Sequence, residues 1–169
     1  MTDYRRSSAA SILIVVVLII IAAHLIPDLV PWFDTKQHWP LTTVVVGAAL
    51  LVAGVIAWRL LILPGLLTLA TGLILWYQNE TNDWSSWAYL WALYPMVVGV
   101  GFMMLGALKG RLMAGFQRAG IPFVLGALAF MIVKGLTRGL TLPVDAWALF
   151  VLALGVFAIY KSRTSRADS

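Results

Sequence analysis

The chain has 169 residues, of which 62% are hydrophobic and only 11% are charged. A soluble domain carries about 25% charged residues, and a globule of this size cannot enclose so much apolar surface, so the composition indicates a protein dissolved in lipid. The absence of cysteine excludes disulfides, thiolate catalysis and cysteine-ligated metals, and we interpret the net charge of +5 as basic residues kept on the cytoplasmic side of a membrane rather than as a nucleic-acid surface.

Six apolar runs follow a short polar start at residues 1–8. A run of about 18 residues at 1.5 Å per residue reaches about 27 Å, close to the hydrocarbon thickness of a bilayer. The runs are residues 9–26, 41–58, 60–77, 87–108, 119–135 and 142–160. They predict an all-α, polytopic integral membrane protein with six transmembrane helices. The first run is long for a signal-peptide core and ends in a poor cleavage site, so we expect an uncleaved helix, with a signal peptide as the alternative.

The segments between the runs predict loops, with one boundary left open. Residues 27–38 contain two prolines, and residues 78–86 form the most polar window of the chain. Residues 111–118 alternate basic and apolar side chains, and we expect a short cytoplasmic turn or helix lying on the lipid headgroups. The second and third runs almost touch, so the turn between them falls either at Arg59 or at Pro64-Gly65.

Basic residues divide unevenly between the two sides that six spans create. With the N-terminus in the cytoplasm, nine Lys or Arg residues fall inside and three fall outside, which satisfies the positive-inside rule. The inside set is Arg5, Arg6, Arg59, Lys109, Arg111, Arg118, Lys161, Arg163 and Arg166, and the outside set is Lys36, Lys134 and Arg138. We therefore predict that both termini are cytoplasmic and that residues 161–169 form a polar, disordered tail.

A tryptophan-led pattern occurs three times with the same internal spacing. The copies are Trp39-x-Leu41-x5-Gly47, Trp91-x-Leu93-x5-Gly99 and Trp147-x-Leu149-x5-Gly155. The first two are offset by 52 residues and also match at Gly54 with Gly106 and at Arg59 with Arg111, whereas the third is offset by 56. A fixed-period repeat of two spans predicts three tandem helical hairpins that point the same way, at residues 9–58, 59–110 and 119–160.

The repeat predicts two structural roles. Small residues seven apart lie on one helix face and let helix backbones approach closely in a membrane. Tryptophan at a headgroup level buries its ring and keeps its N–H in water, and a basic residue anchors the opposite end of the span. We predict helix-packing positions at Gly47, Gly54, Gly99, Gly106 and Gly155, and interface anchors at Trp39, Trp91, Trp147, Arg59 and Arg111.

Residues that could carry chemistry are few and form no known motif. His24 and Asp28 lie four apart, and His38, Asp34, Glu80 and Asp83 share the predicted outer side, but their spacing matches no metal motif, so we expect solvated loop residues. The helix interiors hold no ionisable side chain, which argues against a proton relay or a coupled transporter. Motifs of serine hydrolases, zinc proteases and phosphate-binding loops are also missing. We expect no catalytic residue, no cofactor and no metal, and therefore not an enzyme.

Two segments resemble a known family. They are HWPLTTVVVGAALLVAG, with Trp39-Pro40 followed by Gly47 and Gly54, and SWAYLWALYPMVVGVGFMMLGAL, with Trp91, Pro95, Gly99 and Gly106. Over residues 9–110 the chain resembles the LiaI–LiaF-like transmembrane region of bacterial envelope proteins, in which an aromatic-proline pair enters an apolar helix with regular glycines. The resemblance implies a protein of the bacterial cytoplasmic membrane, associated with envelope-stress sensing and with restraint of a membrane histidine kinase.

Three functional hypotheses remain open at this stage. The leading one is a non-catalytic membrane scaffold or sensor component that packs its helices against itself or against a membrane-protein partner. The alternative is a small channel or facilitator for a weakly polar solute, which a liposome flux assay would test. The third is an enzyme acting on lipids with His24 or His38 as base, which replacement of both histidines by alanine would test.

Overall fold

The computed structural model describes residues 7, 10, 11, 13, 35–139 and 146–167. Most of these residues are helical and none lies in a strand, which confirms the all-α class for the described part of the chain. The expected first helix, residues 9–26, lies almost entirely outside them, as do His24, Asp28 and Asp34. The chain forms two compact units, residues 1–84 and 85–169, which we describe one at a time.

Several described helices are long and apolar enough to cross a membrane. They are His38–Ile56, Arg59–Thr81, Leu112–Arg138 and Trp147–Thr164. The bent pair Trp84–Leu90 and Leu93–Leu108 makes a fifth if the two pieces count as one span. The prediction of multiple membrane-length helices is therefore confirmed for this part of the chain.

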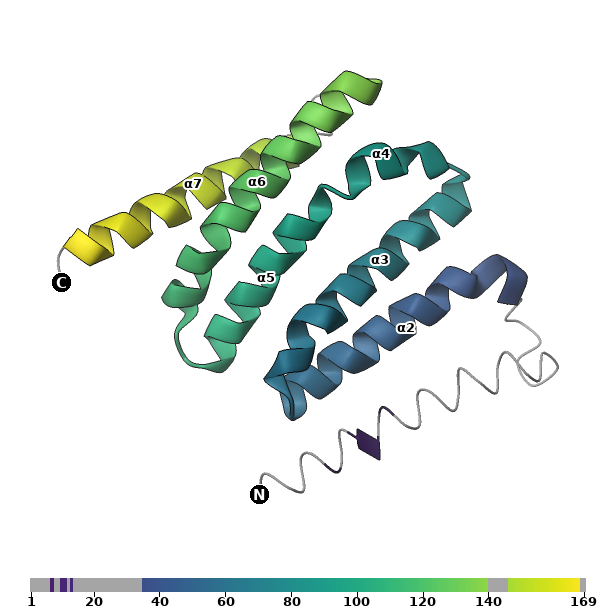
Figure 1. The fold of residues 1–169 in the computed structure, drawn as a ribbon, viewed down its shortest axis with the longest axis horizontal. Helices are drawn as coiled ribbons and strands as arrows, with labels where there is room; N and C mark the ends of the chain where they lie inside the picture. The colour runs from purple at the N-terminus through teal and green to yellow at the C-terminus, as the bar shows by residue number, and fades with distance from the viewer. Residues whose placement is uncertain (1–6, 8–9, 12, 14–34, 140–145, 168–169) are drawn as a thin grey trace. The chain divides into compact units, whose positions relative to one another are not determined.

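In the first unit, α2 (Thr35–Ile56) and α3 (Ile62–Thr81) form an antiparallel pair, joined through the 3-10 turn η2 (Arg59–Leu61) (Figure 1). The turn is therefore at Arg59, because the N–H groups of residues 57 and 58 both donate to the Ala53 carbonyl, at 2.9 and 3.0 Å, and close α2. Pro64 is the third residue of α3, where a backbone N–H would have no acceptor inside the helix. The proline therefore stands inside the helix without breaking it.

The start of α2 lies earlier than expected. The helix begins at Thr35, inside the segment 27–38 that the two prolines predict as a loop, rather than at Leu41. Pro40 lies inside the helix and is fully buried. It removes the single hydrogen bond that its N–H would donate to the carbonyl of Lys36, a loss confined to the second turn, so the helix continues on both sides.

In the second unit, α6 packs against both α5 and α7. The helices are α4 (Trp87–Leu90), α5 (Leu93–Leu108), α6 (Leu112–Arg138) and α7 (Ala146–Ala167) (Figure 1). The buried core of this unit joins Tyr89, Ala92 and Met96 to the apolar side chains of α6 and α7. Because α5 and α7 both run antiparallel to α6, their N-terminal ends lie at the same end of the unit, beside the C-terminal end of α6.

The fourth apolar run is not the single helix that its length predicts. It breaks at Trp91 and Ala92, and the piece Trp84–Leu90, which ends in α4, meets α5 at an angle of 56°. Pro95 explains the break, because it has no N–H to donate to the Trp91 carbonyl. That carbonyl instead accepts from the N–H of Tyr94 at 3.1 Å, and α5 starts again with the proline in its first turn.

Residues 112–118 are the first two turns of α6, so the prediction of a separate interfacial segment at 111–118 is wrong. Gly110, with a φ of 66°, ends the preceding turn, and the good helix formers Leu112, Met113 and Ala114 begin the next helix. Pro122 consequently lies well inside a helix of 27 residues rather than in its first turn. Its missing N–H leaves the carbonyl of Arg118 without the usual helical donor.

The C-terminal tail is helical over most of its length. α7 continues through Ala167, so the prediction that residues 161–169 are disordered is wrong as far as that residue. Two hydroxyl groups hydrogen-bond to backbone carbonyls of the preceding turn. Ser162 Oγ donates to the Ile159 carbonyl at 2.7 Å, and Thr164 Oγ1 donates to the Lys161 carbonyl at 3.1 Å. Lys, Arg and Ala are also favourable helix residues.

Candidate functional site

Glycine and large apolar side chains alternate along the contact between α2 and α3. The contact pairs are Val44 with Gly72, Gly47 with Leu69, Leu51 with Gly65, and Gly54 with Ile62. Along α2 these positions are separated by three, four and three residues, and the same steps run backwards along α3. This is the register of two antiparallel helices that meet along one face. Since every pair contains one glycine, the two backbones approach closely over the whole seam.

The four glycines of this seam face main-chain atoms of the opposite helix. A Cβ on Gly47 would lie 2.5 Å from Leu69 Cα, and a Cβ on Gly72 would lie 2.6 Å from a main-chain nitrogen of α2. No change of rotamer relieves such a contact, because the neighbour is backbone. The repeat predicts Gly47 and Gly54 as packing residues. It does not include Gly65 and Gly72, although they are also seven residues apart.

A second seam joins α5 to α6 with the same chemistry. The contact pairs are Met96 with Gly126, Gly99 with Phe123, and Gly106 with Gly115. Near the turn two glycines face each other, and a Cβ on Gly106 would lie 2.7 Å from Gly115 Cα. The glycines at positions 99 and 106, which the repeat marks as packing residues, therefore both lie at this helix contact.

The third seam lies between α6 and α7. A Cβ on Gly155 would lie 2.8 Å from Val124 Cγ2 and 2.9 Å from the carbonyl oxygen of Gly120. Gly155 belongs to the third copy of the repeat and contacts the preceding helix, whereas the glycines of the first two copies contact the following helix. The α2–α3 contacts therefore join the first predicted hairpin to the second, and the α5–α6 contacts join the second to the third. Only the α6–α7 pair, among these contacts, coincides with a predicted hairpin, the one at 119–160.

Aromatic and basic side chains gather at the end of the second unit where α5 and α7 begin. Phe130 lies 4.6 Å from the Trp147 ring and 5.7 Å from the Tyr89 ring, centroid to centroid, and the Tyr89 contact is edge-to-face. The Lys134 ammonium lies 5.6 Å from the Phe130 ring centre and 5.9 Å from that of Tyr89, and the Arg138 guanidinium lies 5.7 Å from the latter. Both cations are within cation–π range.

The predicted anchors lie at helix ends. Trp39, Trp91 and Trp147 are 38%, 44% and 39% exposed, and each lies at or just before the first turns of its helix. The Trp91 indole N–H donates to a backbone carbonyl of α4 at 2.8 Å. Arg59 opens η2, and Arg111 is the residue that precedes α6. In the second unit, the two tryptophans therefore lie at the end opposite Arg111.

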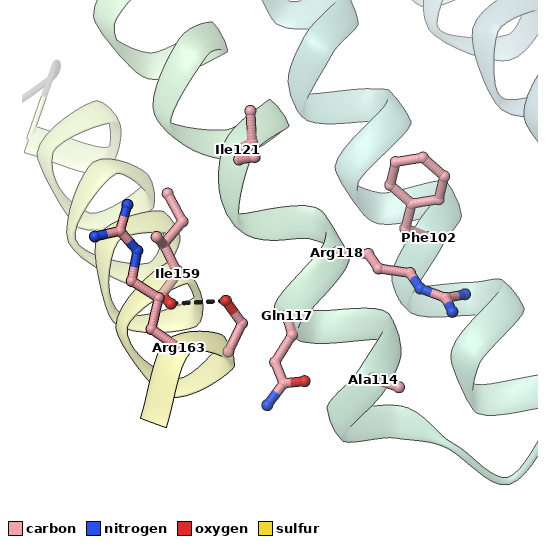
Figure 2. A pocket seen from close by; sticks show the side chains of 8 residues that line it. Phe102, Ala114, Gln117, Arg118, Ile121, Ile159 and Arg163 are labelled. Carbon is pink, nitrogen blue, oxygen red and sulfur yellow. Dashed lines mark hydrogen bonds between the residues drawn. The ribbon is translucent and has the colours of Figure 1, made fainter. Parts of the chain in front are cut away.

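A half-open pocket lies between α6 and α7 at the end of the second unit that contains Arg111. Its volume is about 720 Å³, and we call it the basic pocket. It is lined by Phe102 of α5, by Ala114, Gln117, Arg118 and Ile121 of α6, and by Ile159, Ser162 and Arg163 of α7. Figure 2 shows the Arg118 and Arg163 side chains on opposite sides of Gln117. From the sequence these arginines are only topology signals, because nothing in the sequence places residue 118 beside residue 163.

A smaller pocket of about 190 Å³ adjoins the basic pocket and shares Phe102, Ala114 and Arg118 with it. Its lining adds Lys109 and Arg111. Arg118 is therefore common to two hollows that are lined by basic side chains. These residues and Arg163 come from the loop before α6, from α6 and from α7, and they give this end of the unit a strongly positive surface.

The residues weighed for metal binding are separated by the structure or lie outside it. In the described ranges, no three His, Cys, Asp or Glu side chains come together as a metal site requires. Of the six residues considered, only His38, Glu80 and Asp83 are described. No family model, no curated protein and no solved structure matches the chain. The LiaI–LiaF-like resemblance therefore remains a proposal that rests on the repeat motif.

Proposed function

We propose that this chain is a non-catalytic, multi-pass protein of a bacterial cytoplasmic membrane that acts as a scaffold or as a component of envelope-stress sensing. In this proposal it works by packing its helices against a membrane-protein partner or a second copy of itself. Both termini are cytoplasmic, and the tryptophan-rich helix ends lie at the outer headgroups. The LiaI–LiaF-like resemblance supports the bacterial and regulatory parts of the proposal.

The small buried fraction of the spans supports a membrane location. Only 28%, 28%, 33% and 17% of the four span windows are buried within the chain, although all four are strongly apolar. In water such surfaces would aggregate, whereas lipid tails or neighbouring helices cover them without cost. The span in α7 is the least covered of the four.

The outward face of α7 is the observation that carries the scaffold proposal. Phe150, Phe157 and Tyr160 are 65%, 55% and 65% exposed. A shallow apolar groove of about 550 Å³ follows the helix, lined by Leu149, Leu152, Ala153, Val156, Phe157 and Tyr160. Helices associate in lipid through close packing rather than through the hydrophobic effect, and a groove between side-chain ridges accepts the ridge of another helix.

Single cysteines on α7 test this proposal, because the chain has no cysteine of its own. Val156 is 54% exposed on the outward face and Ala158 is fully buried against α6, two residues further along the same helix. We expect Val156→Cys in native membranes to form a discrete crosslinked dimer or a larger adduct with a bifunctional maleimide. Ala158→Cys, the matched control, should remain uncrosslinked. A Val156→Cys chain that reacts only as a monomer would contradict the proposal.

The membrane orientation has its own test. Reporter domains fused after Glu80 and after Gly139 are expected to be outside the cytoplasm, and a fusion after Gly110 is expected to be inside. The physical reason is the concentration of Lys and Arg at the loop before α6 and at the C-terminal end of α7. Alkaline phosphatase is active only outside the cytoplasm, and green fluorescent protein fluoresces only inside it, so the two reporters distinguish the two sides. A cytoplasmic reporter at Glu80 would refute the orientation without bearing on the α7 contact.

A further inference from the structure

The basic pocket combines three kinds of surface that one amphipathic ligand would use. Its apolar lining comes from Phe102, Ile121 and Ile159, and the rest of its lining offers an amide, a hydroxyl and two guanidinium groups. Arg118 and Arg163 are exposed, so their head groups are accessible from solvent. The same pocket therefore presents apolar side chains to a hydrocarbon chain and cations to a polar head.

The helices that form the pocket are held in place by contacts on either side of it. Gln117 Nε2 donates to the Lys161 carbonyl at 3.4 Å and so links α6 to α7 beside the pocket. Phe116 and Phe157 pack 6.2 Å apart at their ring centres, between the same two helices. The pocket is thus built on two helices already joined by the Gly120 contact, and it does not depend on a loop.

Every charged side chain among the described residues of the second unit, 85–139 and 146–167, is basic. The sequence has no Asp or Glu between Ser85 and Val144, and none between residues 146 and 167. The same two stretches contain eight Lys or Arg residues, four of which line the basic pocket and the pocket that adjoins it. A guanidinium is always charged and has a planar fork of N–H donors that matches phosphate oxygens.

We propose that the basic pocket binds the phosphate group of an anionic phospholipid from the cytoplasmic leaflet. Arg118 and Arg163 donate to the phosphate oxygens, and one acyl chain lies along Ile121 and Ile159. The inference rests on the membrane orientation given under the proposed function, but it does not need the partner contact on α7. Basic pockets between transmembrane helices on the cytoplasmic side are known places for such headgroups.

The size and lining of the pocket favour a lipid over a free phosphate ion. Pockets of about 300–1,000 Å³ hold drug-sized molecules, and the basic pocket has about 720 Å³. Phosphate alone would leave the apolar residues Phe102, Ile121 and Ile159 without a contact.

Lipid retention by the full-length chain tests the proposal. Wild-type protein is placed in nanodiscs made from equal parts of phosphatidylcholine and phosphatidylglycerol. Native mass spectrometry then releases the protein into the gas phase and counts the lipids that stay bound to it. We expect phosphatidylglycerol to be retained in preference to phosphatidylcholine. Arg118→Gln and Arg163→Gln should each reduce this preference about fivefold, and the double variant should abolish it. Arg118→Lys should reduce it less than Arg118→Gln, because the charge remains and the fork is lost.

Arg138→Gln is the matched control, since Arg138 lies on the same helix at the opposite end, where it contacts Tyr89 and Ser85. Its lipid preference should equal that of wild type. An equal fall for Arg138→Gln would overturn the proposal, because the effect would then reflect total charge. Wild-type protein without any preference would overturn it as well, and the reporter fusions would still decide the orientation independently.

A test with inorganic phosphate distinguishes a phospholipid headgroup from a soluble phosphate ion as the ligand of the basic pocket. Inorganic phosphate at millimolar concentration is expected to leave the melting temperature of the lipid-free protein in detergent unchanged. Phosphatidylglycerol added to the same detergent micelles is expected to raise the melting temperature, because it binds to the folded state. Stabilisation by phosphate alone, lost in Arg118→Gln, would assign the pocket to a soluble anion and refute the lipid assignment. Both variants replace exposed side chains, so the protein should fold normally and remain monodisperse.

Discussion

Gly106→Leu is expected to lower the melting temperature of the detergent-solubilised protein by about 2–12 °C. A Cβ at this position would lie 2.7 Å from Gly115 Cα and 2.9 Å from the Arg111 carbonyl oxygen. All of these neighbours are backbone, so α5 and α6 must separate at the turn that joins them. Overpacking of a closed interior costs about 1–3 kcal/mol, and each kcal/mol moves the melting temperature of a chain this long by about 2–4 °C.

Ala107→Leu is the control for this substitution. Ala107 is the next residue along α5 and is exposed, so leucine there adds a similar volume without meeting another helix. Its melting temperature should stay within about 1–2 °C of wild type, as for most surface substitutions. Thermal unfolding followed by size-exclusion chromatography measures both variants. Equal melting temperatures for the two leucine variants would show that the α5–α6 seam does not require glycine.

Phe130→Ala is expected to destabilise the second unit by about 3–5 kcal/mol, the usual cost of removing a buried phenylalanine ring. The ring is only 3% exposed and joins three helices, because it contacts Tyr89 of α4 and Trp147 of α7 from its place on α6. Its loss also removes one of the two aromatic faces near the Lys134 ammonium. The substitution would leave a cavity between Tyr89 and Trp147. These two rings belong to different helices, so they cannot move together to fill it.

Phe150→Ala provides the comparison for the same chemical change. Phe150 is 65% exposed on the outward face of α7, so its replacement should alter the melting temperature by only a few degrees. Chemical denaturation in mixed micelles, followed by tryptophan fluorescence, reports on both variants, since Trp147 lies beside Phe130. A Phe130→Ala protein as stable as Phe150→Ala would mean that the aromatic cluster does not hold α4 and α7 to α6.

The helix boundaries show where local patterns are sufficient and where they are not. The turn between α2 and α3 was narrowed to two positions by Arg59 and by Pro64-Gly65, and hydrogen bonds to the Ala53 carbonyl select the first. The apolar run does not by itself predict the break at Trp91, because its only sign is that Pro95 cannot donate to the Trp91 carbonyl. The sequence does not predict the start of α6 either, because basic residues at 111 and 118 are equally typical of headgroup contacts.

For the described part of the chain, the sequence by itself determined the all-α class and the presence of several helices long and apolar enough to cross a membrane. Its apolar runs have the length of membrane spans, and in lipid a backbone must satisfy its hydrogen bonds within each helix, so composition alone leads to an all-α protein. The spacing of glycine and tryptophan also selected Gly47, Gly99 and Gly155 as residues of special interest.

Only the tertiary structure decided which helices meet at those glycines and which basic residues share a pocket. A helix that is apolar all round has no polar face to indicate the side that turns toward its neighbours. The choice of partner depends instead on the fit of small and large side chains from both helices, as where Gly47 meets Leu69 and Gly99 meets Phe123. For the same reason, Arg118 and Arg163 come to line one pocket through the packing of α6 against α7, which no local pattern records.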